Sequence, residues 1–144
     1  GNDGGEDDDG RVASPAFLPR VIAVGASNEA GAIWTNSSQG DGSGESPNQK
    51  PEVIAPGVNV ISTGSDDAWY ASSGTSVSTV LVSSALAMIL EAHPELMVDD
   101  DRCIEHVKFA LREALGSNHD TRAGYGTLDA KAWFEQIVAI GIGR

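Results

Sequence analysis

Cysteine is almost absent from the 144-residue sequence, which contains only Cys103. One thiol cannot form an internal disulfide, so packing and hydrogen bonds must hold the fold together. Cys103 lies beside Ile104 and near Val107 in a segment that predicts a helix. This position favours a buried small apolar side chain over a reactive thiol, and one cysteine leaves the redox compartment open.

Basic residues are also scarce, because lysine and arginine number 9 against 21 aspartates and glutamates. The net charge is −12 and the pI is near 4.4. Nucleic acids and anionic membranes repel such a surface, so we expect neither as a partner. No apolar run reaches the roughly 18–20 residues that a membrane span needs. The acidic bias is typical both of a high-salt habitat and of an ordinary solvated surface.

The spacing of apolar residues predicts an α/β fold, and the length suits one domain with a core. Short apolar or β-branched segments predict strands at 21–26, 33–36, 52–55 and 58–62. Longer apolar segments predict helices at 75–92, 101–115 and 130–140, the last capped by Asp129. Short strands followed by helices are typical of a parallel or mixed sheet covered by helices.

A serine motif, Gly74-Thr75-Ser76, stands immediately before a long segment rich in small residues. A serine in the first turn of a buried helix is well placed for a nucleophile, because free backbone N–H groups and the helix dipole stabilise a developing oxyanion beside it. The alternative is that Ser76 is simply a residue of the first turn of a core helix.

The serine motif belongs to an ordered series that resembles the subtilisin-like serine proteases, or subtilases, over nearly the whole chain. The series consists of Gly1-Asn2-Asp3-Gly4, the segment 19–26, Val53-Ile54-Ala55-Pro56-Gly57-Val58, Gly74-Thr75-Ser76 and the segment 124–130. The resemblance is to the C-terminal part of the family's catalytic domain. It implies a partial three-layer fold, with a parallel sheet covered by helices, over residues 1–144.

The resemblance assigns roles to individual residues. It implies that Ser76 is the nucleophile, that Asn2 supplies a side-chain amide to the oxyanion hole, and that Gly1, Gly74 and Thr75 border the bound peptide. The family's catalytic aspartate and histidine precede the asparagine turn and therefore lie outside this sequence. We expect the 144 residues alone to be inactive, and the N-terminal portion of the same catalytic domain to be a partner alongside a peptide or protein substrate.

Two residues depart from the family pattern, because Val80 and Leu81 stand where subtilases usually carry proline and histidine. These departures keep open an alternative, a non-catalytic domain of subtilase ancestry that serves binding or assembly. The sequence's three histidines do not supply a base. His93 lies about 25 Å from Ser76 along one helix, and His106 and His119 fall in a later helix and a loop.

Cation binding is the remaining chemistry. The acidic segment 1–10 offers oxygen ligands for calcium, although a solvated loop is the stronger interpretation. The resemblance also implies a cation site formed by the carbonyls of Ala16, Leu18 and Val21 with Glu52. A structural calcium or monovalent cation is thus the one cofactor left open, since the chemistry itself requires none.

No signal peptide is recognisable, which leaves secretion open. Unpaired strand edges would favour a homo-oligomer.

Overall fold

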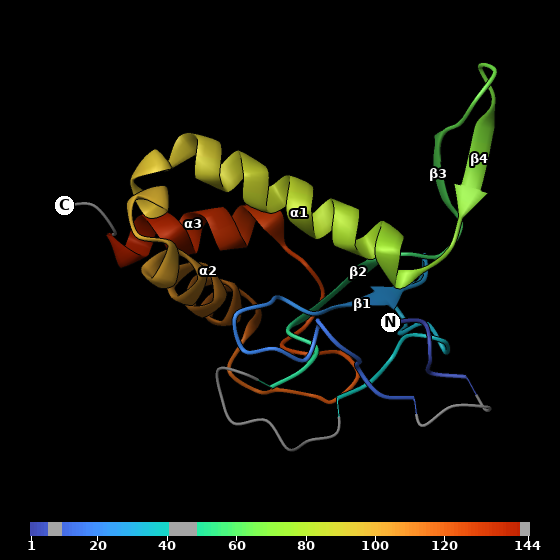
Figure 1. Ribbon diagram of the computed structural model, residues 1–144, viewed down its shortest axis with the longest axis horizontal. Helices are drawn as coiled ribbons and strands as arrows, with labels where there is room; N and C mark the ends of the chain where they lie inside the picture. The colour runs from blue at the N-terminus through green and yellow to red at the C-terminus, as the bar shows by residue number, and fades with distance from the viewer. Residues whose placement is uncertain (6–9, 41–48, 142–144) are drawn as a thin grey trace.

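The computed structural model describes residues 1–5, 10–40 and 49–141 (Figure 1). The elements in chain order are β1 (Val24–Ser27), β2 (Val53–Pro56), β3 (Val60–Thr63), β4 (Trp69–Ser72), α1 (Thr75–Ala92), the 3₁₀ helix η1 (Pro94–Val98), α2 (Asp100–Leu115) and α3 (Ala130–Ile140).

Strands β1 and β2 form a parallel pair at the centre of the molecule, in register from Val24 opposite Val53 to Ser27 opposite Pro56. All four residues of β1 are buried, as are the first three of β2. Helix α1 packs across both strands. The predicted α/β class, with a parallel sheet covered by helices, is therefore confirmed.

The strand predicted at 33–36 does not form. Within this segment Ile33 makes only an isolated bridge to Ser27, and the N–H of Trp34 donates to the carbonyl oxygen of Ala26 at 2.8 Å. The chain then turns, because the N–H of Ser37 bonds back to the carbonyl of Trp34 at 3.0 Å. The segment therefore lines the edge of β1 without extending the sheet.

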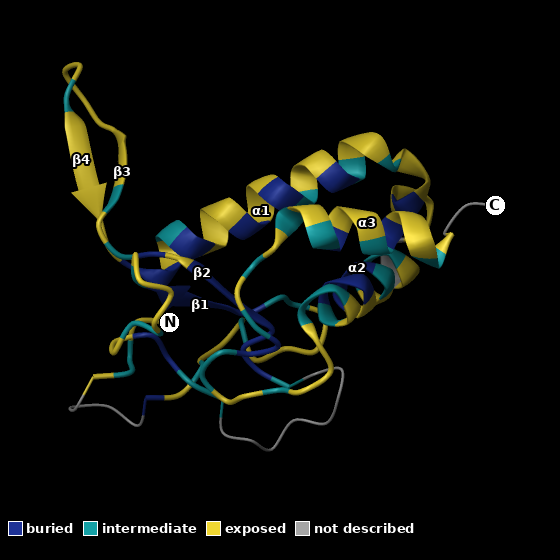
Figure 2. Ribbon diagram, turned by 180° about the vertical axis from the view of Figure 1, so that it is seen from behind, coloured by how far each residue is buried: buried dark blue, intermediate teal, exposed yellow. Residues whose placement is uncertain are grey.

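Helix α1 has the predicted bounds, but it is buried on one side only (Figure 2). The buried stripe recurs at helical spacing and consists of Thr75, Ser78, Val82, Ala85 and Ile89. On the other side, Val80 and Met88 are 63% and 62% exposed. The core helix expected from the sequence is therefore buried on one face, and nothing in the described part of the chain covers the other face.

The apolar character of α1 also corrects the expectation about membrane spans. The described part of the chain contains one helix that is long and apolar enough to cross a membrane, and this helix is α1. Its mean hydropathy over 18 residues is 1.5. A helix that packs into a protein core passes the same test. The stripe from Thr75 to Ile89 packs on β1 and β2, but only 28% of the 18 residues are buried, so most of the apolar side chains of α1 lie outside this stripe.

Helices α2 and α3 pack against each other and complete the core around Trp133. Trp133 is fully buried, and its indole N–H donates to the backbone oxygen of Val107 at 3.0 Å. Asp129 caps α3 as predicted, since its carboxylate accepts the N–H of Ala132 at 2.9 Å. Cys103 packs against the same core, as expected, but it is half-buried rather than buried.

A hairpin of β3 and β4 projects from the body of the molecule (Figure 1). The two strands are antiparallel, with Val60 opposite Ser72 and Thr63 opposite Trp69. Strand β4 was not predicted, because its four residues are exposed and lack the apolar alternation of a half-buried strand. The aromatic residue Trp69 is 72% exposed.

The two tryptophans Trp133 and Trp69 provide a matched test of the core. We expect Trp133→Ala to lower the free energy of unfolding by about 3–5 kcal/mol, because it leaves a large cavity between α2 and α3. Trp69→Ala should change it by no more than about 0.5 kcal/mol, because that side chain is exposed. Urea denaturation of the two variants measures both values. Equal losses would contradict this assignment of the core.

Candidate active site

Ser76 lies in the first turn of α1 with an exposed side chain. The preceding Gly74 is the N-cap residue, and its φ of 153° and ψ of 157° are a conformation that favours glycine. Gly74 itself has no side chain to cap the helix. In the first turn the N–H of Thr75 donates to Asn2 Oδ1 and the N–H of Val77 donates to the carbonyl oxygen of Gly74. The positive end of the helix dipole favours negative charge in the space beside Ser76.

Contacts with the end of β2 hold this turn in place. The N–H of Gly74 donates to the carbonyl oxygen of Gly57 at 2.7 Å. One turn into the helix, the buried Ser78 hydroxyl donates to the carbonyl of Ala55 at 2.9 Å. A Cβ atom on Gly57 would lie 2.2 Å from Ser78 Oγ, so the close approach requires glycine. The candidate nucleophile thus stands at the carboxyl end of a parallel strand, where α/β folds place their sites.

Asn2 reaches the same turn from the other end of the sequence. Its Oδ1 atom accepts the backbone N–H of Thr75 at 2.9 Å and the Thr75 hydroxyl at 2.8 Å. Since both bonds use Oδ1, the Nδ2 amide is left for another partner. A Cβ atom on Gly74 would lie 3.3 Å from Asn2 Nδ2 and 3.9 Å from Ser76 N. Asn2 Nδ2 and the backbone nitrogen of Ser76 therefore border one small space, which a side chain at position 74 would fill.

The turn that carries Asn2 is itself fixed. The carbonyl of Gly1 accepts the N–H of Ser38 at 2.9 Å, and the Ser38 hydroxyl accepts the N–H of Asp3 at 3.0 Å. The N–H of Gly4 donates to Asn36 at 3.0 Å. Sequence reasoning missed this support, because nothing in the local pattern connects residues 36–38 with residues 1–4.

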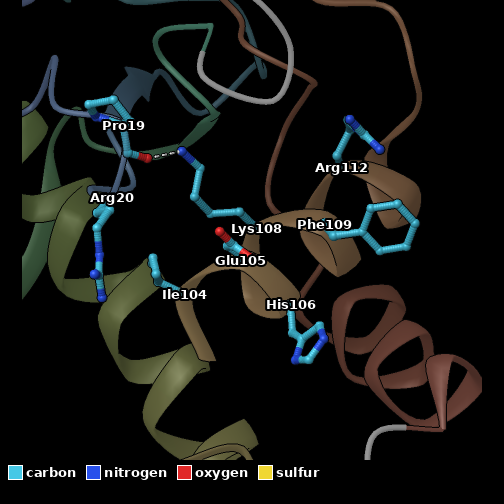
Figure 3. Close-up of a pocket in the computed structure, with 8 residues that line it drawn as sticks. All are labelled: Pro19, Arg20, Ile104, Glu105, His106, Lys108, Phe109 and Arg112. Atoms are coloured by element: carbon cyan, nitrogen blue, oxygen red, sulfur yellow. Dashed lines mark hydrogen bonds between the residues drawn. The ribbon is translucent and has the colours of Figure 1, made fainter. Parts of the chain in front are cut away.

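The structure brings no histidine to Ser76 within the described residues. His93 is the C-cap of α1, at the opposite end of the helix, as predicted, and its Nδ1 lies 2.9 Å from Glu95 Oε1. His106 lies on α2 and lines a separate pocket (Figure 3).

His119 contacts the backbone, because its Nε2 atom lies 2.8 Å from the carbonyl oxygen of Pro51. Its neighbour Asp120 accepts the N–H groups of Ala123 and Arg122, each at 2.8 Å. These two bonds, that of Ala123 first, hold the pKa of Asp120 below its usual range. Asp120 therefore organises its own turn, and no described contact connects the His119–Asp120 pair with Ser76.

Lysine side chains lie where the predicted cation ligands meet. The Lys50 ammonium donates to the carbonyl oxygen of Val21 and to Glu52 Oε1, the latter at 2.7 Å. The Leu18 carbonyl accepts the N–H of Val21 at 3.1 Å. Burial lowers the pKa of Lys50, and the hydrogen bond and charge of Glu52 act in the opposite direction. Two of the four residues in the predicted cation site of Ala16, Leu18, Val21 and Glu52 are therefore already engaged by an ammonium group.

The acidic segment 1–10 is described only in part, since residues 6–9 lie outside the described residues. In the part of the chain that is described, no three His, Cys, Asp or Glu side chains come together as a metal site.

Comparison with known proteins identifies relatives of the whole arrangement. A family model described as the Subtilase family matches residues 1–129. Subtilisin of Bacillus pumilus is 38% identical over 94 residues, which cover 65% of this chain and 31% of that protein. The halolysin-like extracellular serine protease Nep of Natrialba magadii is 31% identical over 127 residues, which cover 88% of this chain and 21% of that protein.

The solved structure of the self-cleaved protease domain of PatA has the same fold, with a TM-score of 0.73 and 25% identity. The match covers 96% of this chain and 48% of that domain. The chain therefore spans about half of this solved relative, and its matches span 31% and 21% of the two curated proteins.

Two substitutions at Asn2 separate its acceptor from its donor. Asn2→Ala removes the acceptor for Thr75 and should lower the free energy of unfolding by about 1 kcal/mol, as the loss of a helix cap does. Asn2→Asp keeps an oxygen at that position, and its negative charge faces the helix N-terminus, so its stability should stay within about 0.5 kcal/mol of the parent. Urea denaturation measures both. Equal destabilisation by the two variants would show that Oδ1 does not anchor the turn.

Proposed function

The chain belongs to the subtilase family, and on this premise we propose that it is the C-terminal portion of the catalytic domain of a subtilisin-like serine endopeptidase. The observation that carries the proposal is the arrangement at the start of α1. An exposed Ser76 stands in the first turn, beside an asparagine whose side-chain oxygen is fixed by Thr75. The substrate class is peptides or proteins.

In the proposed reaction the Ser76 hydroxyl attacks the carbonyl carbon of the peptide bond. A histidine from the N-terminal portion of the domain accepts the hydroxyl proton, and an aspartate from the same portion orients that histidine. Asn2 Nδ2 and the backbone N–H of Ser76 hold the oxyanion of the tetrahedral intermediate. Removal of such a side-chain donor typically costs about 2.7–4 kcal/mol of transition-state stabilisation.

The three residues expected to border the substrate divide into two roles. Gly74 leaves open the space beside Asn2 Nδ2 and Ser76 N, so we assign it to the substrate site. Gly1 directs its carbonyl to Ser38, and its role is to support the asparagine turn. Thr75 is buried and directs its hydroxyl to Asn2, so we propose that it is a positioning residue rather than a substrate contact.

The departures at Val80 and Leu81 are compatible with this function. Both side chains lie on the exposed side of α1, at 63% and 37% exposure, and the helix runs without interruption past them. Neither takes part in the contacts that fix the first turn. The lack of a histidine contact to Ser76 in the described part of the chain is expected under both the catalytic and the non-catalytic function, and the labelling experiment below distinguishes the two.

The exposed face of α1 supports the proposed partner. Val80, Leu81 and Met88 form an apolar surface on a helix that packs on its other side against the sheet. Monomeric proteins rarely leave such a face open to water. Because the solved PatA domain is about twice as long as its matched region, we propose that the N-terminal portion of the catalytic domain covers this face.

An active-site probe tests the function. We expect a fluorophosphonate not to label the 144-residue chain alone, because no base activates Ser76. With the N-terminal portion of the catalytic domain added, labelling should appear and should be lost in Ser76→Ala. Asn2→Ala should slow peptide hydrolysis about 10²- to 10³-fold. The control is Ser84→Ala, which removes an exposed serine of the same helix and should change nothing.

Each contrary result of this experiment has a meaning. Strong labelling of Ser76 in the chain alone would show that these residues contain a base. A stable complex of the two portions that remains unlabelled would favour the non-catalytic function.

Self-association tests the exposed face independently. The charge of −12 opposes the association of two copies at low salt, and the Debye length shortens to about 3 Å at 1 M salt. We therefore expect light scattering to show dimers that become more abundant as salt rises. The double variant Val80→Gln, Met88→Gln keeps the net charge and should stay monomeric. A parent chain that is monomeric throughout the salt series would contradict the expectation.

A further inference from the structure

A buried charge cluster lies at the opposite end of β2 from Ser76, and the proposed chemistry does not use it. It consists of Lys50, Glu52 and Lys108, whose residues are 9%, 2% and 6% exposed. Glu52 Oε1 lies 2.7 Å from the ammonium nitrogens of both lysines. Glu52 Oε2 accepts the backbone N–H of Ala23 at 2.7 Å. One carboxylate is therefore shared between two cations and the backbone.

The lysines also bind the loop that precedes β1. The Lys50 ammonium donates to the carbonyl oxygen of Val21, 29 residues away. The Lys108 ammonium reaches from α2 to the carbonyl oxygen of Pro19, 89 residues away (Figure 3). The cluster thus joins three segments that are distant in sequence, namely this loop, the start of β2 and helix α2. Buried lysines are rare in proteins unless they are paired.

This ligand set resembles that of a metal site, but a metal does not fit it. Backbone carbonyls and a carboxylate are the ligands that calcium and sodium prefer. Here the ammonium groups already engage Glu52 Oε1 and the carbonyl of Val21, and Glu52 Oε2 already accepts the N–H of Ala23. Two ammonium groups and one carboxylate sum to a charge of +1, and a divalent ion would raise that sum to +3 in a buried position. The electrostatic cost opposes the entry of such an ion.

We propose that the ammonium of Lys50, supported by that of Lys108, takes the place of a bound metal ion at this position. The protein's own side chains thereby join the loop before β1, the start of β2 and helix α2 without a metal ion. A bound ion stabilises a protein only in proportion to its free concentration relative to its dissociation constant. A covalently attached ammonium has no such dependence. The stability that this cluster provides is therefore independent of calcium and of sodium, and the cluster binds neither ion.

The first test uses a local signal, the amide resonance of Ala23, whose N–H bonds to Glu52. Calcium chloride is titrated into the 144-residue chain at constant ionic strength, and ¹H–¹⁵N spectra are recorded. We expect the Ala23 resonance not to move. Calcium bound in the acidic segment 1–10 would move resonances there and leave Ala23 in place. A saturable shift of Ala23 would overturn the proposal.

The second test removes the ammonium. Lys50→Met keeps the length of the side chain and leaves Glu52 with one cation fewer. Breaking a buried ion pair should lower the melting temperature by about 10 °C. The carbonyl oxygen of Val21 and Glu52 Oε1, which lose the Lys50 ammonium, should then accept an ion. Calcium should therefore raise the melting temperature of the variant and leave that of the parent unchanged. The matched control is Lys131→Met, an exposed lysine of α3 paired with Glu135, which should behave as the parent does.

Two further results bear on the proposal. A parent chain that loses stability when EDTA removes calcium, together with a moving Ala23 resonance, would show that a metal occupies the cluster. If Lys50→Met does not fold, Lys50→Arg keeps a positive charge and should retain a melting temperature that calcium does not change. A calcium-dependent Lys50→Arg melting temperature would contradict the proposal.

Discussion

The close approach of α1 to the end of β2 is the constraint on which the site depends. Gly57 permits it, because any side chain there would collide with Ser78 and with the backbone of Gly74. The hydrogen bonds from Gly74 to Gly57 and from Ser78 to Ala55 then fix where the helix begins. With the start of the helix fixed, Ser76 is exposed in the first turn, and its backbone nitrogen and Asn2 Nδ2 both lie within 4 Å of the position that a Cβ atom on Gly74 would take.

The two ends of β2 are held by different chemistry. At the carboxyl end, neutral hydrogen bonds and glycines bring the backbone of β2 and the start of α1 close together. At the amino end, Glu52 and two lysines join the strand to α2 and to the loop before β1. The strand between them is short and buried, so polar contacts at its ends set its position as much as packing does. A site that needs precise geometry benefits from such a strand.

The asymmetry of α1 connects the structure with the family. One side of the helix is packed against the sheet, and the other presents apolar side chains to water. Its composition, small and apolar nearly all round, is that of a helix covered on both sides. The chain spans about half the length of the solved PatA domain, which has the same fold over the matched part. The exposed side is therefore consistent with a helix that belongs to a larger domain.

The sequence alone determined the features that depend on near neighbours. The bounds of α1 and α3 and the Asp129 cap followed from helical periodicity and capping, which act within a few residues, and the serine motif marked the start of α1. Only the tertiary structure decided which distant groups meet. Asn2 and Thr75 are 73 residues apart, and Lys108 and Pro19 are 89 apart. A lysine that replaces a cation cannot be recognised from the local sequence pattern. Its partners here are backbone carbonyls, which every residue type carries. Strand β4, exposed on a hairpin, lacks the apolar alternation from which a strand is predicted.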